Sequence, residues 1–399
     1  MPLAGLANLV APSFFIVAVL MMLAWFIERH SDFYSGLVDR EQAANRFHSI
    51  DGLRGFLAIF VLLHHSVVNY FFYSVGRWST PPSRVATLLG QGGVAMFFMV
   101  TSLLFCHRAL TLRGRVNLRR FFWSRIQRIV PMYMASALIV VLVACALTHF
   151  RLNVPLSQFA KDCSAWLLFT FPGTPAVNGY SDTPLINTVY WSLVYEWKFY
   201  LIFPILIFFA SGFASFIAIG VCALLIHWYS SSNVEWYFIY GALTASVIYY
   251  FPSIKRIMAG SLGSVALVAL LFVISRTAET AYDSHKAPLF FLAFLIIASG
   301  NTLFGLLTCR PARVLGAISY SAYLIHNIIL YLVFRLVNHF VAIASLGLET
   351  YWCITAVIGV LTVICSAITY RHIEHRFMKF GIPRRMHCKD ALLRRFGLR

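Results

Sequence analysis

Charged residues are scarce in this sequence, and their scarcity limits what the protein can be. Only 12% of the 399 residues are charged and only 14 are acidic, whereas 60% are hydrophobic and the mean hydropathy is +0.77. Soluble domains carry about 25% charged residues, so this composition excludes an ordinary soluble protein. It indicates a protein built to lie in a membrane.

Cysteine patterns and sequence repeats are also missing. Among the eight cysteines only Cys163 falls in a predicted outer loop, so no disulfide framework is available. No Cys/His spacing typical of a metal site occurs, and we expect no bound metal. There is no internal repeat and no low-complexity tract.

Long apolar stretches are what the sequence has instead. About eleven of them reach the roughly 17–25 residues that an α-helix needs to cross a bilayer. We therefore expect an all-α, polytopic transmembrane helix bundle with about 11 spans. The predicted spans are residues 8–28, 54–74, 90–108, 129–148, 190–210, 212–230, 234–251, 260–276, 287–308, 314–338 and 350–371.

The formal net charge of +18 follows the topology of these spans. If the segment after the first span is cytoplasmic, most of the 32 Lys and Arg residues fall on that side, in alternate loops and in the tail after residue 371. This bias matches the positive-inside rule and needs no nucleic acid to explain it. It predicts a multi-pass protein with its N-terminus outside and its C-terminus cytoplasmic. The first span lacks the features of a cleaved signal peptide and is expected to be retained.

The stretch "RGFLAIFVLLHH", Arg54 to His65, places titratable groups inside a predicted span. A helix turns about 100° per residue, so His65 lies only about 20° from the direction of Arg54, roughly 16 Å further along the axis. Gly55 and Ala58 would leave this side of the helix uncrowded, as a buried passage requires. Asp51 is placed to cap the helix N-terminus.

An ionisable residue at this depth in a membrane is costly and usually functional. For His65 we favour a functional role over a structural hydrogen bond to a neighbouring helix, because Arg54 shares its face. His64 points away and is expected to be structural or supporting. His227 and His339, near span ends, are expected to be structural.

The stretch "SIDGLRGFLAIFVLLHH" resembles the first-helix signature of the acyltransferase-3 family of integral-membrane acyltransferases, in which ten residues separate an arginine from a histidine. Further stretches similar to the family follow in its order. They are "GGVAMFFMVTSLLF" (92–105), "RRFFWSRIQRIVPMY" (119–133), "YWSLVYEWKFYLIFP" (190–204), "LGAISYSAYLIH" (315–326) and "YRHIEHRF" (370–377).

The resemblance implies a fold and a domain organisation. The family fold is a ten-helix bundle, so residues 1–47 would hold an extra N-terminal transmembrane helix and a cytoplasmic linker. Residues 48–380 would form the transmembrane acyltransferase domain, and residues 381–399 a basic cytoplasmic tail. No soluble esterase-like domain follows, so the chain looks like the stand-alone type.

The resemblance also implies a reaction, the transfer of acetyl from cytoplasmic acetyl-CoA to a hydroxyl of a lipid-linked or exported glycan, at a bacterial inner membrane. Acetyl-CoA would be a co-substrate, and no bound cofactor is expected. Coenzyme A carries phosphates that arginine recognises well. Arg125 and Arg128 share a helical face and match the family's paired arginines, so we expect them to bind the acyl-CoA. Most of the other arginines of the 108–128 loop would set topology or contact anionic lipids.

His65 would act as the general base toward the acceptor hydroxyl, or would carry the acyl group itself as a relay. Arg54 and Glu196 complete the expected catalytic set. Glu196, placed at the outer end of a span, would orient His65 or bind sugar hydroxyls, unless it is an interfacial cap. The sequence leaves direct transfer and the relay open.

Four further residues and Asp51 are possible lining residues of a passage. Ser319, Tyr323 and His326 share one helical face, as an inward polar stripe or as interhelical hydrogen-bonding groups. Trp191 could stack on a sugar, although a place in the aromatic belt is the commoner explanation. Glu374 is expected to pair with an arginine of the basic loop.

Two rival functions remain open at this stage. A permease or flippase for glycans or small molecules would also place polar groups at mid-depth, and a membrane scaffold could keep the signature without activity. The outer loop at about 149–189 is either an irregular lid or a plain connector.

Overall fold

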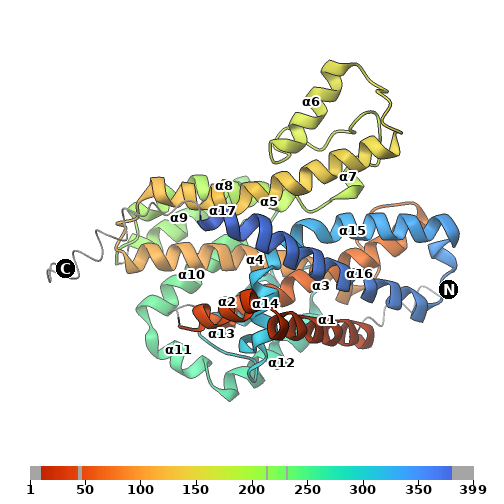
Figure 1. Cartoon of the computed structure of the whole chain (residues 1–399). Coiled ribbons are helices and arrows are strands. Elements are labelled where there is room, and N and C mark those ends of the chain that lie inside the picture. The colour runs from red at the N-terminus through yellow and green to blue at the C-terminus, as the bar shows by residue number, and fades with distance from the viewer. Residues whose placement is uncertain (1–9, 44–46, 213, 231, 380–399) are drawn as a thin grey trace.

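The computed structural model describes residues 10–43, 47–212, 214–230 and 232–379, and over these ranges the protein is all-α (Figure 1). The predicted basic tail, residues 381–399, lies outside the described residues. The helices in chain order are α1 (Val10–His30), α2 (Asp32–Ala43), α3 (His48–Val75), α4 (Arg84–Thr111), α5 (Leu118–Leu147), α6 (Leu156–Leu167), α7 (Thr183–Ile186), α8 (Trp191–Phe208), α9 (Ala214–Tyr229), α10 (Trp236–Tyr250), α11 (Pro252–Met258), α12 (Ser261–Thr277), α13 (Ala287–Ala298), α14 (Arg310–Ala317), α15 (Ser319–Phe340), α16 (Leu348–Thr369) and α17 (His375–Lys379).

Every predicted span overlaps a helix, but fewer than eleven helices are long enough to cross a membrane alone. Within the described residues seven helices pass by length and composition, or eight if α11 and α12, bent by 78° at their junction, form one span. Helices α9, α10 and α13 have 16, 15 and 12 residues. Helix α13 ends at Ala298, and the backbone turns at Gly300, which has a φ of 98°.

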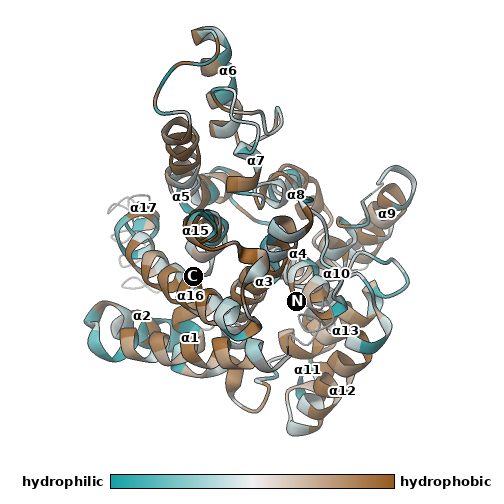
Figure 2. Ribbon diagram, turned by 90° about the vertical axis from the view of Figure 1, so that its right-hand side faces the viewer, coloured by the Kyte–Doolittle hydropathy of each residue, from teal (hydrophilic) through white to brown (hydrophobic). Residues whose placement is uncertain are grey.

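Helix α3 forms the centre of the bundle. It packs against α4, α14 and α15, and most of its residues are buried. Hydrophobic residues colour much of the surrounding helices (Figure 2), and many of their large apolar side chains, such as Leu142, Phe208 and Phe272, are exposed at the surface. An apolar exterior around a buried central helix is the arrangement expected for a bundle solvated by lipid.

Glycines bring α3 into backbone contact with α14 and with the 3-10 turn (Leu306–Thr308) that precedes it. A Cβ on Gly52 would lie 1.9 Å from the carbonyl oxygen of Leu307 in this turn, and one on Gly316 of α14 would lie 1.8 Å from that of Asp51. Gly55 likewise packs against Leu315 and Gly316. The expectation that Gly55 leaves room for a passage is therefore wrong, because α14 fills that side of α3. The contact fixes the first turns of α3, which carry Asp51 and Arg54.

The outer segment between α5 and α8 is folded. Helix α6 projects from the bundle at the end of α5 (Figure 1), and Trp166 on this helix is fully buried. The carbonyl of Trp166 accepts a hydrogen bond from the Tyr133 hydroxyl at 2.5 Å, and its indole nitrogen donates to Pro175 at 2.9 Å. The segment is thus an ordered structure rather than a plain connector.

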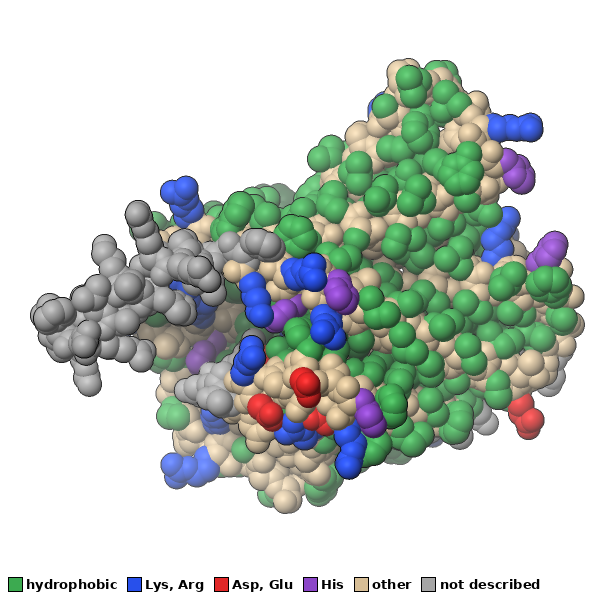
Figure 3. All heavy atoms as spheres, viewed as in Figure 1, with side chains coloured by type: hydrophobic (Ala, Val, Ile, Leu, Met, Phe, Trp, Pro, Cys, Tyr) green, Lys and Arg blue, Asp and Glu red, His purple; other side chains and the backbone are tan. Residues whose placement is uncertain are grey.

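The N-terminal helix α1 packs on α14 and α16 and is tied to the bundle by Arg310. The guanidinium of Arg310 lies 2.6 Å from the Glu28 carboxylate and 3.0 Å from that of Asp39 on α2. These two carboxylates raise the pKa of Arg310. Several basic side chains gather at the end of the molecule where α2 and α17 lie, beside a broad hydrophobic flank (Figure 3).

Candidate active site

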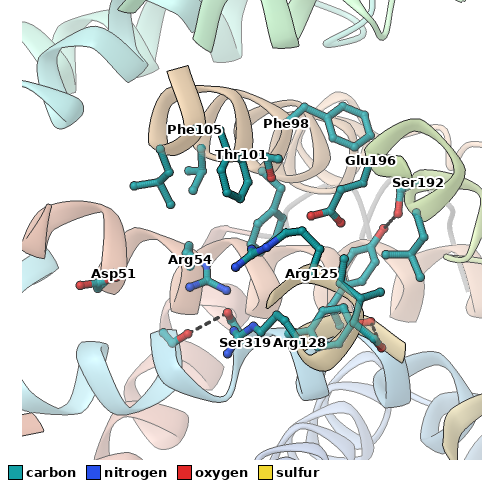
Figure 4. Close-up of a pocket in the computed structure, with 18 of the residues that line it drawn as sticks. Asp51, Arg54, Phe98, Thr101, Phe105, Arg125, Arg128, Ser192, Glu196 and Ser319 are labelled. Carbon is teal, nitrogen blue, oxygen red and sulfur yellow. Dashed lines mark hydrogen bonds between the residues drawn. The ribbon is translucent and has the colours of Figure 1, made fainter. Parts of the chain in front are cut away.

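A cavity of about 420 Å³ opens among α3, α4, α5, α8 and α15. Its volume is typical of small-molecule sites. Arg54 from α3 and Arg125 and Arg128 from α5 point into the same space, with Glu196 of α8 nearby (Figure 4). The polar residues of its lining include Glu41, Asp51, Arg54, Thr101, Arg108, Arg125, Arg128, Ser192, Glu196, Ser319, Tyr320 and Tyr323.

Three of the four lining arginines keep their charge available to a ligand. In the described part of the chain no carboxylate lies within salt-bridge distance of Arg54, Arg108 or Arg125. The Arg125 guanidinium lies over the Phe105 ring, 4.8 Å from its centroid, which orients the group without neutralising it. Guanidinium groups held in this way suit phosphate oxygens.

Arg128 is different, because it has a partner inside the protein. Its guanidinium lies 2.6 Å from the carboxylate of Glu374, which is completely buried. The Ser321 hydroxyl donates to the same carboxylate at 2.9 Å. The prediction that Glu374 pairs with an arginine of the basic loop is confirmed.

Glu196 lies in the second turn of α8 and lines the cavity. The chain just before α8 is buried, with Asn187, Val189 and Tyr190 each at 1% exposure. Glu196 accepts a hydrogen bond from Tyr200 and has arginines of the cavity as its charged neighbours. Nothing in the described residues joins it to His65.

His65 lies in a second cluster further along α3. Its Nδ1 is 3.0 Å from the carbonyl oxygen of Val61 and 3.1 Å from Nε2 of His326, and its Nε2 is 3.3 Å from the hydroxyl of Thr188. Trp78 lies nearly parallel to the His65 ring, with the centroids 6.4 Å apart. His65 is partly exposed, whereas His326 is 1% exposed.

These contacts assign the protons of the two rings when both are neutral. A carbonyl only accepts, so His65 carries its proton on Nδ1, facing Val61, and His326 carries its proton on Nδ1, 3.1 Å from the Ala322 carbonyl. Nε2 of His326 then accepts from Nδ1–H of His65. The lone pair of His65 Nε2 then accepts a hydrogen bond from the Thr188 hydroxyl.

His64 has a separate and structural place. Its Nδ1 lies 2.8 Å from the carbonyl oxygen of Ala86 on α4, and its ring fills the space beside Gly90, where a Cβ would lie 2.2 Å from the imidazole. It joins α3 to α4, in agreement with the supporting role expected from its direction.

The cavity and the His65 cluster are adjacent but distinct. Arg54 lines the cavity, whereas His65 is not among the described residues that do so. Tyr323 touches both sites: it lines the cavity, its ring centroid lies 6.0 Å from that of His326, and its hydroxyl lies 2.7 Å from that of Ser192. The shared helical face of Arg54 and His65 therefore runs from the cavity to the histidine cluster, and the cavity itself does not reach His65.

The other predicted lining residues divide between these places. Asp51, Ser319 and Tyr323 line the cavity, and the buried Oδ2 of Asp51 has no hydrogen-bond partner among the described residues. His326 lies outside the cavity against His65. Trp191 is 40% exposed and does not line the cavity.

Thr188, Ser192 and Trp78 were not predicted from the sequence. Thr188 lies just before the motif that begins at Tyr190, and Ser192 lies within it, which was the available signal, but a single hydroxyl has no periodic pattern. Trp78 reaches His65 from a loop beyond α3, which no spacing rule predicts. Within the described residues no group of three His, Cys, Asp or Glu side chains could hold a metal ion.

Comparisons with known proteins bear on this site. A family model described as an acyltransferase domain matches residues 47–371. The O-acetyltransferase OatA of Staphylococcus aureus strain NCTC 8325 is 25% identical over 372 residues, which cover 83% of this chain and 57% of OatA. A putative O-acetyltransferase of S. aureus strain COL is 24% identical over 379 residues, 84% of this chain and 57% of its own length. This chain thus spans less than two thirds of these relatives. No solved structure matches it significantly.

Proposed function

Since the chain belongs to the acyltransferase-3 family of membrane acyltransferases, we propose that it is an O-acetyltransferase that moves acetyl from acetyl-CoA to a glycan hydroxyl. The observation that carries the proposal is the pairing of two adjacent sites on α3. One is a cavity lined by Arg54 and Arg125, which have no carboxylate within salt-bridge distance in the described residues, and the other is a histidine whose Nε2 lone pair faces a hydroxyl.

The cavity would hold the coenzyme A part of the donor. Arg54 and Arg125 are the proposed ligands of its phosphates, because no carboxylate of the described residues lies within salt-bridge distance of either of them. The unpartnered Oδ2 of Asp51 would accept a hydrogen bond from an N–H or O–H group of the same molecule. Arg128 would contribute less directly, since Glu374 already engages it.

His65 would take the proton of the attacking hydroxyl at Nε2. As the new C–O bond forms at the thioester carbonyl, the C–S bond breaks, and the thiolate of coenzyme A takes that proton. The thioester would approach His65 past Tyr323, which lines the cavity and contacts His326. Glu196 would hold cavity arginines in place rather than polarise His65.

The acceptor would approach from the opposite side of the membrane. We propose that the end of the bundle with α2 and α17 is cytoplasmic, and that the ordered segment with α6 and α7 is external, in a bacterial inner membrane. Helices α9, α10 and α13 would cross together with the non-helical residues at their ends, which gives the predicted eleven spans. A lipid-linked or exported glycan then meets His65 from the side of Trp78 and Thr188.

The test compares surface glycans by mass spectrometry in three strains: one without the gene, one with the gene and one with His65→Ala. We expect one added acetyl group per modified sugar only in the strain with the unaltered gene. A permease or scaffold would leave the acetylation state the same in all three strains, and that result would remove the proposal. Immunodetection of the variant in membranes controls for its abundance.

A further inference from the structure

Thr188 is the polar side chain that faces the lone pair of His65. Its hydroxyl lies 3.3 Å from Nε2 of His65, and Nδ1 of the same imidazole lies 3.1 Å from Nε2 of His326. A hydroxyl beside a histidine base, with a third group orienting that base, is the arrangement by which proteins activate hydroxyl nucleophiles. The proposed function uses His65 but leaves Thr188 without a role.

The backbone around Thr188 is held firmly, as a nucleophile requires. The side-chain amide of the preceding Asn187 donates to the carbonyl of Leu324 at 2.8 Å, and Tyr190 donates to Ser136 at 2.8 Å. Asn187 and Tyr190 are buried, but Thr188 between them is partly exposed, so its hydroxyl is both positioned and reachable.

We infer that Thr188 is acetylated during turnover, with His65 as its base and His326 as the residue that positions His65. The inference rests on the proposed function and specifies how the acyl group travels between the two sides of the membrane. Donor and acceptor are both large and arrive from opposite ends. A side chain that holds the acetyl group removes the need for both to reach His65 at once.

The chemistry balances over two steps. In the first, His65 Nε2 takes the Thr188 proton, the threonine oxygen bonds to the thioester carbonyl carbon, the C–S bond breaks, and the proton passes to the thiolate to give free coenzyme A. In the second, a sugar hydroxyl gives its proton to His65 and attacks the threonine ester. The ester C–O bond to Thr188 breaks, and the threonine oxygen takes the proton back.

The experiment uses the purified full-length protein in detergent without acceptor, supplied with acetyl-CoA that carries a radiolabelled acetyl group. We expect about one equivalent of free coenzyme A in a burst, and label that stays on the protein after denaturation. Peptide mass spectrometry should place the acetyl group on Thr188. Adding the glycan acceptor should discharge the label. The unaltered protein is also assayed for net transfer to acceptor.

Four single variants and one double variant make the result specific. Thr188→Val keeps the shape of the side chain without its hydroxyl and should lose both label and transfer, whereas Thr188→Ser should keep both. Ser181→Ala removes a hydroxyl of the same outer segment away from His65 and should behave as the unaltered protein. His65→Ala should lose label, and its combination with Thr188→Val should cost no more than either change alone, since the two residues act as a unit.

Normal transfer by Thr188→Val would overturn the inference and leave direct transfer by His65. Label that persists on Thr188→Val would also overturn it, because the acyl group would then lie on another residue such as His65. In both cases the proposed acetyltransferase function would stand. Absence of transfer by the unaltered protein, or normal transfer by His65→Ala, would instead overturn the proposed function, and the inference with it.

Discussion

Arg125 and Arg128 lie one helical turn apart on α5, and their different surroundings separate two roles that the sequence treats as one. Arg125 has an aromatic support and no carboxylate partner in the described residues, whereas Arg128 is engaged by Glu374. Arg125, which has no carboxylate partner in the described residues, is the better ligand for the phosphates of acetyl-CoA. Arg128, which is paired with Glu374, is better suited to join α5 to the π-helical turn Tyr370–Glu374 that follows α16.

Replacing Arg125 with Ala should raise the KM for acetyl-CoA about tenfold or more while kcat changes less. The reason is the loss of a charge-assisted hydrogen bond worth about 1.5–3 kcal/mol. Initial rates measured against acetyl-CoA concentration give both constants. Arg119→Ala, an exposed arginine on the same helix, is the matched control. An unchanged KM in Arg125→Ala would mean that this arginine serves only topology.

Replacing Arg128 with Ala should chiefly reduce stability. It leaves the carboxylate of Glu374 buried without its cation, which costs about 3–5 kcal/mol. The midpoint of thermal unfolding in detergent should fall, and the double change Arg128→Met with Glu374→Gln should recover much of the loss. If the double variant is as unstable as Arg128→Ala alone, the ion pair is not the cause.

His326 should affect turnover rather than donor binding. His326→Ala removes one of the two acceptors of Nδ1–H of His65 and leaves only the Val61 carbonyl, so kcat should fall while the KM for acetyl-CoA stays near its original value. His326→Gln, whose amide oxygen can accept at about the same place, should retain much more activity. His339→Ala, an exposed histidine on the same helix, serves as the control. Equal losses in the Ala and Gln variants would indicate a packing role only.

At this scale helical geometry and the resemblance together predicted part of the site. Arg54, Arg125, Arg128 and Glu196 do meet in one cavity, and the partner of Glu374 was foreseen. The contacts of His65 with His326 and with Thr188 were not foreseen. His326 lies 261 residues from His65 along the chain, and Thr188 lies 123 residues from it. Which helices become neighbours is a tertiary property that spacing within one helix does not contain.

At the scale of elements, the close approach of α3 and α14 sets where the cavity begins. A Cβ at Gly316 would overlap the carbonyl oxygen and carbon of Asp51. Both of these atoms belong to the backbone, so they cannot move aside as the end of a flexible side chain could. The first turns of α3 would then separate from α14. The same turns position Arg54 for the donor, so packing and binding are coupled here.

Gly316→Ala should therefore lower the yield of folded protein and its unfolding midpoint in detergent, both measured by size-exclusion chromatography after heating. Gly36→Ala on α2 is the control, because a Cβ there meets no atom within 4 Å. Alanine is favoured over glycine inside a helix by about 1 kcal/mol, so this variant should be unchanged or slightly more stable. Equal stability of the two variants would contradict the close packing of α3 on α14.

The helices themselves were largely predictable from the sequence, but their ends were not. Apolar length located α3, α4, α5, α15 and α16, because a bilayer imposes the same requirement on every spanning helix. Breaks such as the bend between α11 and α12 depend on local backbone conformation, which hydropathy averages away. The position of Glu196 in the cavity likewise depends on how α8 packs against its neighbours, which hydropathy does not describe.

For the molecule as a whole, the two sites of α3 would connect a cytoplasmic donor with an external acceptor. The apolar exterior agrees with the class that composition predicted, a polytopic helical membrane protein. The family was predictable because its motifs follow in order along most of the chain. The acceptor sugar was not predictable, since its proposed contacts would come from loops such as those of Trp78 and Thr188, which lack a general pattern.

The most direct test of this account supplies acetyl-CoA with a radiolabelled acetyl group to membranes that contain the protein and glycan acceptor, with the unaltered chain and with His65→Ala at equal abundance. We predict label in the glycan fraction with the unaltered chain and background label with the variant, because Nε2 of His65 is the proposed base of the transfer. Equal labelling by the two proteins, or none by either, would contradict the assignment.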